Sequence, residues 1–378
     1  MILGLVLVGL VYLITIGLLL VGSIQLPEFT SEEKETKTHF SVIIPFRNEA
    51  IHLPTLIASL KQLKYPKEQY ELIFVDDASE DDSIKIIETL LKGETKLQFK
   101  IISSIRSSKS PKKDAITNAI RISKYQWILT TDADCHVPQR WLQMYDRYIQ
   151  NYEPKCIAGP VDLIADQSFI QLYQQLDNWS LQGVAMGSFG LHAPILCNGA
   201  NLAYRKDAFL HVEGFKGNDH IASGDDIFIL EKMKKAFPKK VHYLKSKKAI
   251  VSTQGVQRWY QVLSQRIRWA SKTSKQKNLQ SIGLGVIVFV TNVLLLVGLV
   301  LCFFWASLIP YYISFLVAKS LIDYISLSKT AAFYNKRIAV WVFLFSAVIY
   351  PFLTICVVLG SFSGRYHWKG RLHKKQIN

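Results

Sequence analysis

Cysteine is scarce in this chain of 378 residues, and its five cysteines stand far apart in the sequence. None of them belongs to a Cys-x-x-Cys pair, and their odd number leaves no complete set of disulfides. The histidines likewise show no metal-ligand spacing. The sequence therefore predicts neither a disulfide framework nor a zinc site, and it suits a reducing compartment.

Nucleic-acid-binding motifs, internal repeats and low-complexity tracts are also missing from the sequence. The net charge is nevertheless +16, from 45 basic and 29 acidic residues. Because the basic residues are spread along the chain, we expect no nucleic-acid partner. An excess of lysine and arginine beside membrane segments is typical of a domain that faces the cytoplasm and rests on anionic lipid.

Charged residues are absent from Ile2 to Ile24, a segment long enough to span a hydrocarbon layer about 30 Å thick. No basic region precedes the segment, and no small-residue cleavage site clearly follows it. We therefore interpret it as a membrane anchor rather than a signal peptide. Two further strong spans are expected near the C-terminus, at Ile282 to Ala306 and at Ile338 to Leu359.

A third apolar segment near the C-terminus, Leu308 to Leu327, contains Lys319 and Asp323. These two residues lie one helical turn apart and could pair. The basic C-terminal tail and the central domain are both expected on the cytoplasmic side, so an even number of crossings must separate them. We therefore expect this third segment to be interfacial or re-entrant. In the alternative arrangement it crosses and the tail lies outside.

Between the apolar ends, short β-branched runs alternate with segments of helical periodicity. Strands are expected at Phe40–Pro45, Tyr70–Val75, Phe99–Ser103 and Tyr125–Thr130. Helices are expected at Leu53–Leu63, Asp82–Leu91, Lys112–Ser123, Trp141–Ile149 and Gly224–Ala236. This alternation predicts an α/β domain built on a mostly parallel sheet that is covered on both faces.

Acidic residues follow two of the expected strands, at Asp76-Asp77 and at Asp132-Ala133-Asp134. In parallel α/β sheets ligands bind beyond the carboxyl ends of the strands. An Asp-x-Asp motif at such an end suits a hard divalent cation that also holds phosphate oxygens. Either motif alone could be a helix cap or a solvated turn, but their shared position at strand ends favours a functional site.

Two motifs further along the chain extend this interpretation. Asp225-Asp226 opens an expected helix and could supply a general base, although helix capping would also explain it. The basic segment from Gln257 to Lys277 contains tryptophans and is typical of an interfacial amphipathic helix. Beside a membrane, such a segment could guide a lipid-linked or polymeric acceptor.

Several motifs occur together in the order that one protein family shows. They are Ser41-Val42-Ile43-Ile44-Pro45-Phe46-Arg47-Asn48-Glu49, Val75-Asp76-Asp77-Ala78-Ser79, Lys112-Lys113-Asp114-Ala115, Thr131-Asp132-Ala133-Asp134, Asn198-Gly199-Ala200-Asn201, Gly224-Asp225-Asp226 and Gln265-Arg266-Ile267-Arg268-Trp269. On these motifs the sequence resembles a family 2 inverting glycosyltransferase. It is most similar to membrane-integrated members such as polysaccharide synthases and lipid glycosyltransferases. The resemblance implies a nucleotide-diphospho-sugar transferase (GT-A, Rossmann-like) fold with N-terminal and C-terminal transmembrane helices.

The resemblance also implies a domain order. It gives a transmembrane anchor (1–24), a linker (25–39), a glycosyltransferase catalytic domain (40–250), an interfacial segment with the Gln-x-x-Arg-Trp motif (251–280), a C-terminal membrane region (281–361) and a basic tail (362–378). Within the catalytic domain, the residues from Ile157 to His220 show a looser pattern. We expect an acceptor-side region there.

On the donor side, the resemblance implies contacts from residues at the strand ends. Pro45 and Glu49 would lie near the base and ribose, and Asp77 would bind the base, for which uracil is expected. Lys112, with Lys113 as its alternate, would approach the nucleotide. Asp132 would contact the ribose or phosphate, and Asp134 would bind Mg²⁺ or Mn²⁺.

On the acceptor side, the resemblance makes Asp226 the catalytic base. The residues implied to border the acceptor and the diphosphate are Asp225, Gln265, Arg268 and Trp269. The sequence departs from the family at one point, because many relatives have Glu-Asp where this chain has Asp225-Asp226. The base is retained, but its shorter neighbour makes the local geometry less certain.

Together these features predict a membrane-bound enzyme at the cytoplasmic face of the plasma membrane. It would move a sugar from a UDP-sugar to a hydroxyl of a lipid, lipid-linked or glycan acceptor. Processive polysaccharide synthesis is the main alternative, although the small number of spans favours single or short transfer. A sugar-phosphate nucleotidyltransferase or an inactive scaffold would not need Asp226 and the Gln265, Arg268 and Trp269 motif.

Overall fold

The computed structural model describes residues 2–31, 34–221, 223–273, 278–363, 365–368 and 371–374. The chain divides into two compact units. The first, which we call the α/β unit, combines residues 27–164 and 196–254, and the second, the helical unit, combines residues 1–26, 165–195 and 255–378. Residues 165–195, which fall within the expected domain over 40–250, pack with the apolar helices in the second unit.

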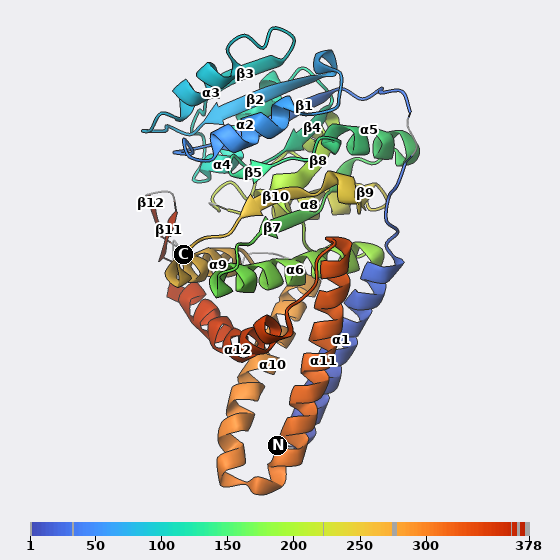
Figure 1. The fold of residues 1–378 in the computed structure, drawn as a ribbon, viewed down its shortest axis with the longest axis vertical. Coiled ribbons are helices and arrows are strands. Elements are labelled where there is room, and N and C mark those ends of the chain that lie inside the picture. The colour runs from blue at the N-terminus through green and yellow to red at the C-terminus, as the bar shows by residue number, and fades with distance from the viewer. Residues whose placement is uncertain are drawn as a thin grey trace. The chain divides into compact units, whose positions relative to one another are not determined.

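A seven-stranded sheet forms the centre of the α/β unit, in the order β3-β2-β1-β4-β8-β6-β9 (Figure 1). Strands β1 to β4 run parallel, as expected, whereas β8 is antiparallel to both of its neighbours. The strands are β1 (Phe40–Phe46), β2 (Tyr70–Asp76), β3 (Gln98–Ser103), β4 (Trp127–Thr130), β6 (Cys156–Ala158), β8 (Leu202–Arg205) and β9 (Val241–Tyr243). A smaller sheet contains β5 (Cys135–His136), β10 (Val251–Gln254) and β7 (Val161–Ile164).

Strands β1 and β2 are buried along nearly their whole length, as their continuous apolar runs require. Their side chains join those of the flanking helices in one core that includes Leu56, Leu72 and Trp141. The helices of this unit are α2 (Leu53–Lys61), α3 (Ser83–Leu91), α4 (Pro111–Ile122), α5 (Trp141–Tyr152), α7 (Lys206–His211) and α8 (Asp225–Ala236). Short 3-10 turns occur at Lys67–Gln69, Gly199–Asn201 and Lys247–Ala249.

The helical unit contains α1 (Ile2–Gln25), α6 (Phe169–Gly190), α9 (Trp259–Thr273), α10 (Leu279–Phe304), α11 (Ile309–Phe333) and α12 (Val340–Ser363). A 3-10 turn at Ala306–Leu308 joins α10 to α11, and a hairpin of β11 (Arg365–Trp368) and β12 (Arg371–Lys374) follows α12. Four helices are long and apolar enough to cross a membrane: α1, α10, α11 and α12. Figure 1 shows α1, α10 and α11 running alongside one another, whereas α12 lies oblique to them.

The 22-residue helix α6 lies in the segment whose pattern is loose in the sequence. Its glycines reduce its intrinsic helix propensity, but they are needed for packing. A Cβ atom at Gly187 or Gly190 would collide with the backbone of α1 at Leu19 or Gly22. Helix α6 therefore forms through close contact with α1 and not through local preference.

Helix α11 is uninterrupted from Ile309 to Phe333, and it packs along α1. The expected pair is present within it, since Lys319 Nζ lies 2.8 Å from Asp323 Oδ2. Tyr12 of α1 donates a hydrogen bond of 2.7 Å to the other oxygen of Asp323. The helix is continuous across Leu308 to Leu327, and the interfacial or re-entrant placement of this segment stays a prediction.

Candidate active site

The candidate site lies where the parallel strands end. Pro45 is paired in register with Val75, and the Asp77 amide continues the ladder by donating to the Phe46 carbonyl at 2.9 Å. On the other side of β1, the Thr131 amide donates to the Ile43 carbonyl at 3.2 Å. Asp77 follows β2 and the Asp132–Asp134 turn follows β4, the two strands that flank β1, so both lie at the same edge of the sheet, as the sequence predicts.

Lys112 joins the acidic motifs to each other. Its Nζ lies 2.6 Å from Asp132 Oδ1 and 3.1 Å from Asp225 Oδ2. Burial alone would lower the pKa of Lys112, but attraction to Asp132, Asp225 and Asp226 raises it above its ordinary value. The side chain is therefore a fixed cation between carboxylates from two different elements.

The backbone of α8 fixes the position of the second acidic pair. Gly224 precedes the helix at φ +86°, a conformation that favours glycine, and it places Asp225 and Asp226 in the first helical turn. The Ile227 amide donates to Asp226 Oδ1 at 2.8 Å. A carboxylate held in this way keeps a constant direction, which a general base requires.

Gly199 brings the Asn198-Gly199-Ala200-Asn201 motif against the same cluster. A Cβ atom at Gly199 would lie 2.7 Å from Asp225 Oδ2 and 3.5 Å from Lys112 Nζ. The motif is therefore more than an ordinary surface turn. Its last residue is structural, because the buried Asn201 amide donates to the carbonyls of Pro160 and Ala249.

Lys113 does not join the cluster in the way that Lys112 does. It is almost fully buried, and its Nζ donates to the carbonyls of Asn218 at 2.7 Å and Ile221 at 3.0 Å. It also lies over the Phe228 ring, 4.6 Å from the centroid. Of the two lysines expected as alternates, the structure thus brings Lys112 to the acidic residues and gives Lys113 contacts with the 218–221 segment.

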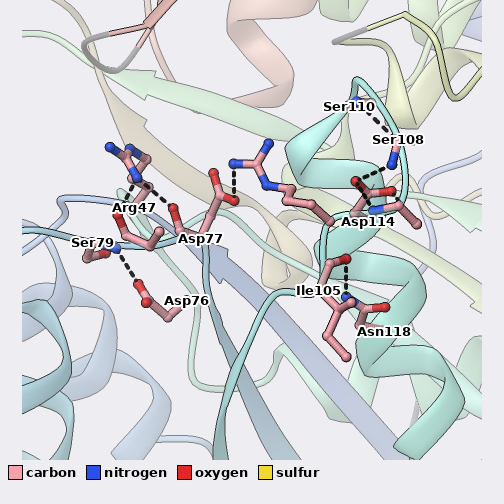
Figure 2. Close-up of polar contacts among 12 residues, drawn as sticks. Arg47, Asp76, Asp77, Ser79, Ile105, Ser108, Ser110, Asp114 and Asn118 are labelled. Atoms are coloured by element: carbon pink, nitrogen blue, oxygen red, sulfur yellow. Dashed lines mark hydrogen bonds and ion pairs between the residues drawn. The ribbon is translucent and has the colours of Figure 1, made fainter.

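At the other end of the site, Asp77 is flanked by two arginines that sequence reasoning missed (Figure 2). Arg106 Nη2 lies 2.5 Å from Asp77 Oδ1, and Arg47 Nη1 donates to the Asp77 carbonyl at 2.8 Å. Arg47 also donates to the carbonyl of Ala78, whose φ of +57° is unusual for a residue with a side chain. Only the family motif around Arg47 gave a signal for either residue.

The remaining donor-side residues lie close to these strand ends. Pro45 is half-buried near the end of β1. Glu49 is buried in the turn before α2, where its amide donates to Ser83 Oγ at 2.9 Å. The placement of both residues near a nucleoside stays a prediction.

A divalent metal is the cofactor that the resemblance implies, and Asp134 is its expected ligand. The Asp134 side chain is exposed on the turn after β4, two residues beyond the half-buried Asp132. Among the described residues, no three Asp, Glu, His or Cys side chains converge as a complete protein cage. One or two carboxylates at an open strand end fit the mode in which Mg²⁺ or Mn²⁺ is shared between protein and substrate phosphates.

The Gln265 to Trp269 motif lies on α9, in the helical unit. Gln265, Arg268 and Trp269 are each half-buried. Between them in sequence, Arg266 stacks on the Trp269 ring, 4.2 Å from its centroid, and forms an ion pair with Asp177 of α6. Burial raises the pKa of Asp177, and the Arg266 charge opposes that shift. Neither Arg266 nor Asp177 was predicted as a site residue.

The comparison with protein-family profiles decides the family. The profile described as glycosyl transferase family 2 matches residues 41–212. The profile described as glycosyl transferase family group 2 matches residues 127–357, more than half of the chain. This chain is a family 2 glycosyltransferase. The expected family is thereby confirmed.

A solved structure supports the fold. The mannosyltransferase PcManGT from Pyrobaculum calidifontis, in complex with GDP-Man and Mn²⁺, superposes with a TM-score of 0.59 at 14% identity. The superposition covers 95% of this chain and 96% of that one. This family 2 glycosyltransferase therefore has a GT-A fold with long apolar helices, as predicted.

Curated relatives match shorter stretches of the chain. The poly(ribitol-phosphate) beta-N-acetylglucosaminyltransferase TarS of Staphylococcus aureus is 28% identical over 113 residues, which are 30% of this chain and 19% of TarS. The undecaprenyl-phosphate 4-deoxy-4-formamido-L-arabinose transferase of Proteus mirabilis is 33% identical over 99 residues, 26% of this chain and 29% of that enzyme. These matches span less than a third of either relative.

Proposed function

We propose that this family 2 glycosyltransferase moves a sugar, with inversion, from a nucleotide-diphosphate donor to a hydroxyl of a membrane-associated acceptor. The observation that carries the proposal is the cluster at the sheet edge, where Lys112 lies between Asp132 and Asp225 with Gly199 against them. Sugar transfer needs a cation near the leaving diphosphate and a general base near the acceptor hydroxyl. Lys112 would supply the cation, and Asp226 in the first turn of α8 would supply the base.

The donor would lie along the ends of β1, β2 and β4. Asp77 would accept hydrogen bonds from the base, for which we propose uracil, with Pro45 and Glu49 nearby. Asp132 would contact the ribose or phosphate, and Lys112, which lies beside Asp132, would approach the nucleotide at its diphosphate. When bound, Mg²⁺ or Mn²⁺ would neutralise charge on the leaving diphosphate, and Asp134 would hold it.

In the chemical step, the Asp226 carboxylate would take the proton of the acceptor hydroxyl. The hydroxyl oxygen would form a bond to the anomeric carbon, and the bond from that carbon to the diphosphate oxygen would break. The electron pair of the broken bond would leave with the nucleoside diphosphate. Lys112 would stabilise that charge, and the backbone contact of Asp226 would keep the base in line.

The acceptor is proposed to be a lipid, a lipid-linked sugar or a glycan. Two kinds of support favour a membrane acceptor: the four apolar helices of this chain and the undecaprenyl-phosphate substrate named for the Proteus mirabilis relative. This acceptor would be bordered by three residues of α9: Gln265, Arg268 and Trp269. Asp225 would lie between the proposed catalytic base, Asp226, and Lys112. The name of the TarS relative gives poly(ribitol-phosphate) as its acceptor, so a polymeric acceptor is the alternative that the assay must separate.

The nucleotide sugars of cells are cytosolic, so we propose that the α/β unit faces the cytoplasm. The turn between α10 and α11 has no lysine or arginine, whereas Lys336 and Arg337 lie between α11 and α12. This charge difference favours crossing by both α10 and α11. The basic tail and the α/β unit are both expected on the cytoplasmic side, which requires an even number of crossings between them. If α10 and α11 both cross, α12 must not.

Contacts within the helical unit support this arrangement. The Phe345 ring of α12 meets the Phe169 ring of α6 with 6.3 Å between centroids, and Gly360 lies against Ile267 of α9. Helix α12 runs along α9 and α6, which are not candidate spans, and it also packs against α10, which is one. We propose that α12 lies in the interfacial region and that α11, not α12, crosses.

The function is tested with purified protein in detergent and native lipid extract. The protein is supplied with UDP-, GDP- and dTDP-sugars and with Mg²⁺ or Mn²⁺, and released nucleotide is measured together with labelled products. We expect metal-dependent release from a UDP-sugar and label in a lipid-extractable product. Label in a large, lipid-insoluble product would instead show polymer synthesis, and release from no donor despite nucleotide binding would sink the transferase proposal under these conditions.

The topology is tested by cysteine labelling in intact cells, in a background that lacks the native cysteines. We expect a membrane-impermeant maleimide to label Ser307→Cys, in the turn between α10 and α11. Asn335→Cys and Ser363→Cys should react only after the cells are opened. External labelling at Ser363→Cys would show that α12 crosses.

A further inference from the structure

The segment between β3 and α4 carries Arg106, and two residues of α4 hold that segment. Asp114 accepts from the Ser107 amide at 3.2 Å, from Ser107 Oγ at 2.9 Å and from the Ser108 amide at 3.0 Å. One helical turn later, Asn118 Nδ2 donates to the Ile105 carbonyl at 2.9 Å. Figure 2 shows the Asn118 side chain directed at Ile105 and the Asp114 side chain directed at the stretch that contains Ser108.

These bonds are strong for a surface loop. Asp114 is only 4% exposed, and an ionised acceptor that takes two amides and a hydroxyl makes charge-assisted bonds. The loop closes on itself as well, because the Ser110 amide donates to Ser108 Oγ at 3.0 Å and the Asp114 amide to the Ser110 carbonyl at 3.0 Å. The backbone at residue 106 is therefore fixed from both sides.

Arg106 itself has no such support for its side chain. Its side chain is 39% exposed, while the Asp77 carboxyl group that it meets is 8% exposed. An ion pair with one exposed partner gains little when the long side chain must be ordered for it. A backbone that is already fixed lowers that entropic cost, so the Asp77 pair depends on the loop.

The Asp77 pair matters because of the charge around it. Asp76 lies beside Asp77 in sequence, and Glu80 approaches from the same turn through its ion pair with Arg47. A nucleotide donor is an anion, and an uncompensated Asp77 would repel it. Arg106 cancels that charge. It also orients the Asp77 carboxyl group, which binds the nucleobase of the donor in the proposed function.

We propose that Asp114 and Asn118 are positioning residues for donor binding. They hold residues 105–108 so that Arg106 stays on Asp77 at the nucleoside end of the site. The proposal rests on the proposed function, because Asp77 is a donor contact only in an enzyme that uses a nucleotide sugar. It adds two residues of α4 that touch neither the donor nor the reacting atoms.

The test is a double-mutant cycle measured by calorimetric titration of UDP and GDP into the full-length protein with Mn²⁺. Arg106→Ala is expected to weaken binding about tenfold, as is Asp114→Asn, which replaces the charged acceptor of two amides with a neutral one. Asn118→Ala should weaken it by a smaller factor. If Asp114 acts through Arg106, the double variant binds no more weakly than Arg106→Ala alone.

A matched control lies on the same helix between the two residues. Thr117 bonds only within α4, to the Lys113 carbonyl at 2.7 Å, so Thr117→Ala should bind nucleotide as the wild type does. Thermal unfolding of every variant separates positioning from stability. If Asp114→Asn does not fold, the cycle of Asn118→Ala with Arg106→Ala gives the same information.

The outcomes distinguish the two proposals. Fully additive losses, or unchanged nucleotide affinity in folded Asp114→Asn and Asn118→Ala proteins, would overturn the positioning role alone. If the wild type binds no nucleoside diphosphate, the proposed function fails first. Unchanged affinity in Asp77→Asn would show that Asp77 is not a donor contact, and the positioning role would fall with it. In turnover assays we expect the donor KM to rise more than kcat falls.

Discussion

Each unit of this glycosyltransferase contains a lysine paired with aspartate, and the two pairs are built differently. Lys319 in the helical unit is 5% exposed and meets Asp323 one turn along the same helix, while Tyr12 occupies the other carboxylate oxygen. Lys112 in the α/β unit is 20% exposed and lies between Asp132 and Asp225, which come from a turn and a separate helix.

The difference lies in charge balance. Lys319 and Asp323 cancel each other, and the hydroxyl of Tyr12 completes the group without adding charge. Around Lys112 the carboxylates outnumber the cation, since Asp226 follows Asp225 and Asp134 follows Asp132. The Lys319–Asp323 pair carries no net charge and needs no further partner, and we call it the closed pair. The cluster around Lys112 has an excess of carboxylates at the sheet edge, which suits a metal and a diphosphate that arrive with the donor, and we call it the open cluster.

The largest effect should come from removing the proposed general base, Asp226, in the acidic cluster around Lys112. Asp226→Asn keeps the shape and the amide contact of the side chain but cannot take a proton. We expect transfer to fall by roughly 10²–10⁴-fold, the usual contribution of general base catalysis. Single-turnover assays measure this loss, and calorimetry should show that nucleoside diphosphate binding survives.

A control for Asp226→Asn is Asp207→Asn, at an exposed carboxylate on α7 whose partner is Arg205. It changes charge by the same amount in the same unit and should leave transfer within about twofold of the wild type. Equal activity in Asp226→Asn and the wild type would remove Asp226 from the mechanism.

The closed pair should instead govern stability. Lys319→Met leaves the half-buried Asp323, whose side chain is 19% exposed, with Tyr12 alone, and removing one partner of such a pair costs up to about 3 kcal/mol. We expect that loss in reversible unfolding in detergent. The double variant Lys319→Met with Asp323→Leu should recover most of it, because no charge is left unpaired. No recovery would mean that the pair specifies packing beyond its charge.

Lys112 and Lys113 sharpen the comparison, because they are neighbours on α4 with opposite surroundings. Lys113→Met leaves two buried carbonyls without their donor, and we expect a loss of about 2 kcal/mol in unfolding free energy. Lys112→Met should cost less stability but weaken donor binding about tenfold. Parallel unfolding and nucleotide titration of the two variants measure both effects, and identical profiles would contradict the distinction.

The sequence predicted the strand-end position of the acidic motifs in the open cluster well, because the signals for it are local. The apolar runs before Asp76 and Asp132 give the strands, and parallel strands must end at one edge. The position of Lys113 could not be predicted in the same way. Which of two adjacent lysines faces the carboxylates depends on where the 218–221 backbone passes, and that backbone is distant in sequence.

The same reason explains what was missed elsewhere. Arg106 meets Asp77 because β3 pairs with β2 and the Ser104 amide donates to the Asp76 carbonyl, and no spacing in the sequence encodes that pairing. Helix α6 depends on glycines that a propensity argument counts against a helix, but contact with α1 makes them necessary. Pairings within one element were predictable, and pairings that tertiary contact creates were not.

The smallest expected effect concerns a buried carboxylate of the α/β unit whose oxygens already have hydrogen-bond partners. Glu71 on β2 is 1% exposed and accepts from Ser41 Oγ at 2.7 Å and from the Lys124 amide at 2.6 Å. Burial alone would raise the pKa of Glu71, but these bonds and the Lys100 ammonium at 3.0 Å lower it below its ordinary value. A carboxyl group with a lowered folded-state pKa stabilises the fold above its unfolded pKa of about 4.3, and that contribution is lost as the pH falls through the folded value.

Unfolding free energy should therefore decline on acidification through this range, and Glu71→Gln should flatten the decline. Glu94 is the informative control, because the ammonium groups of Lys67 and Lys61 lower its pKa as well, but at the surface. Salt at about 1 M shortens electrostatic range to roughly 3 Å and should remove most of the Glu94→Gln effect. The Glu71→Gln effect should persist, since its hydrogen bonds are closed to solvent. If salt removed the Glu71→Gln and Glu94→Gln effects equally, burial would not be what distinguishes Glu71 from Glu94.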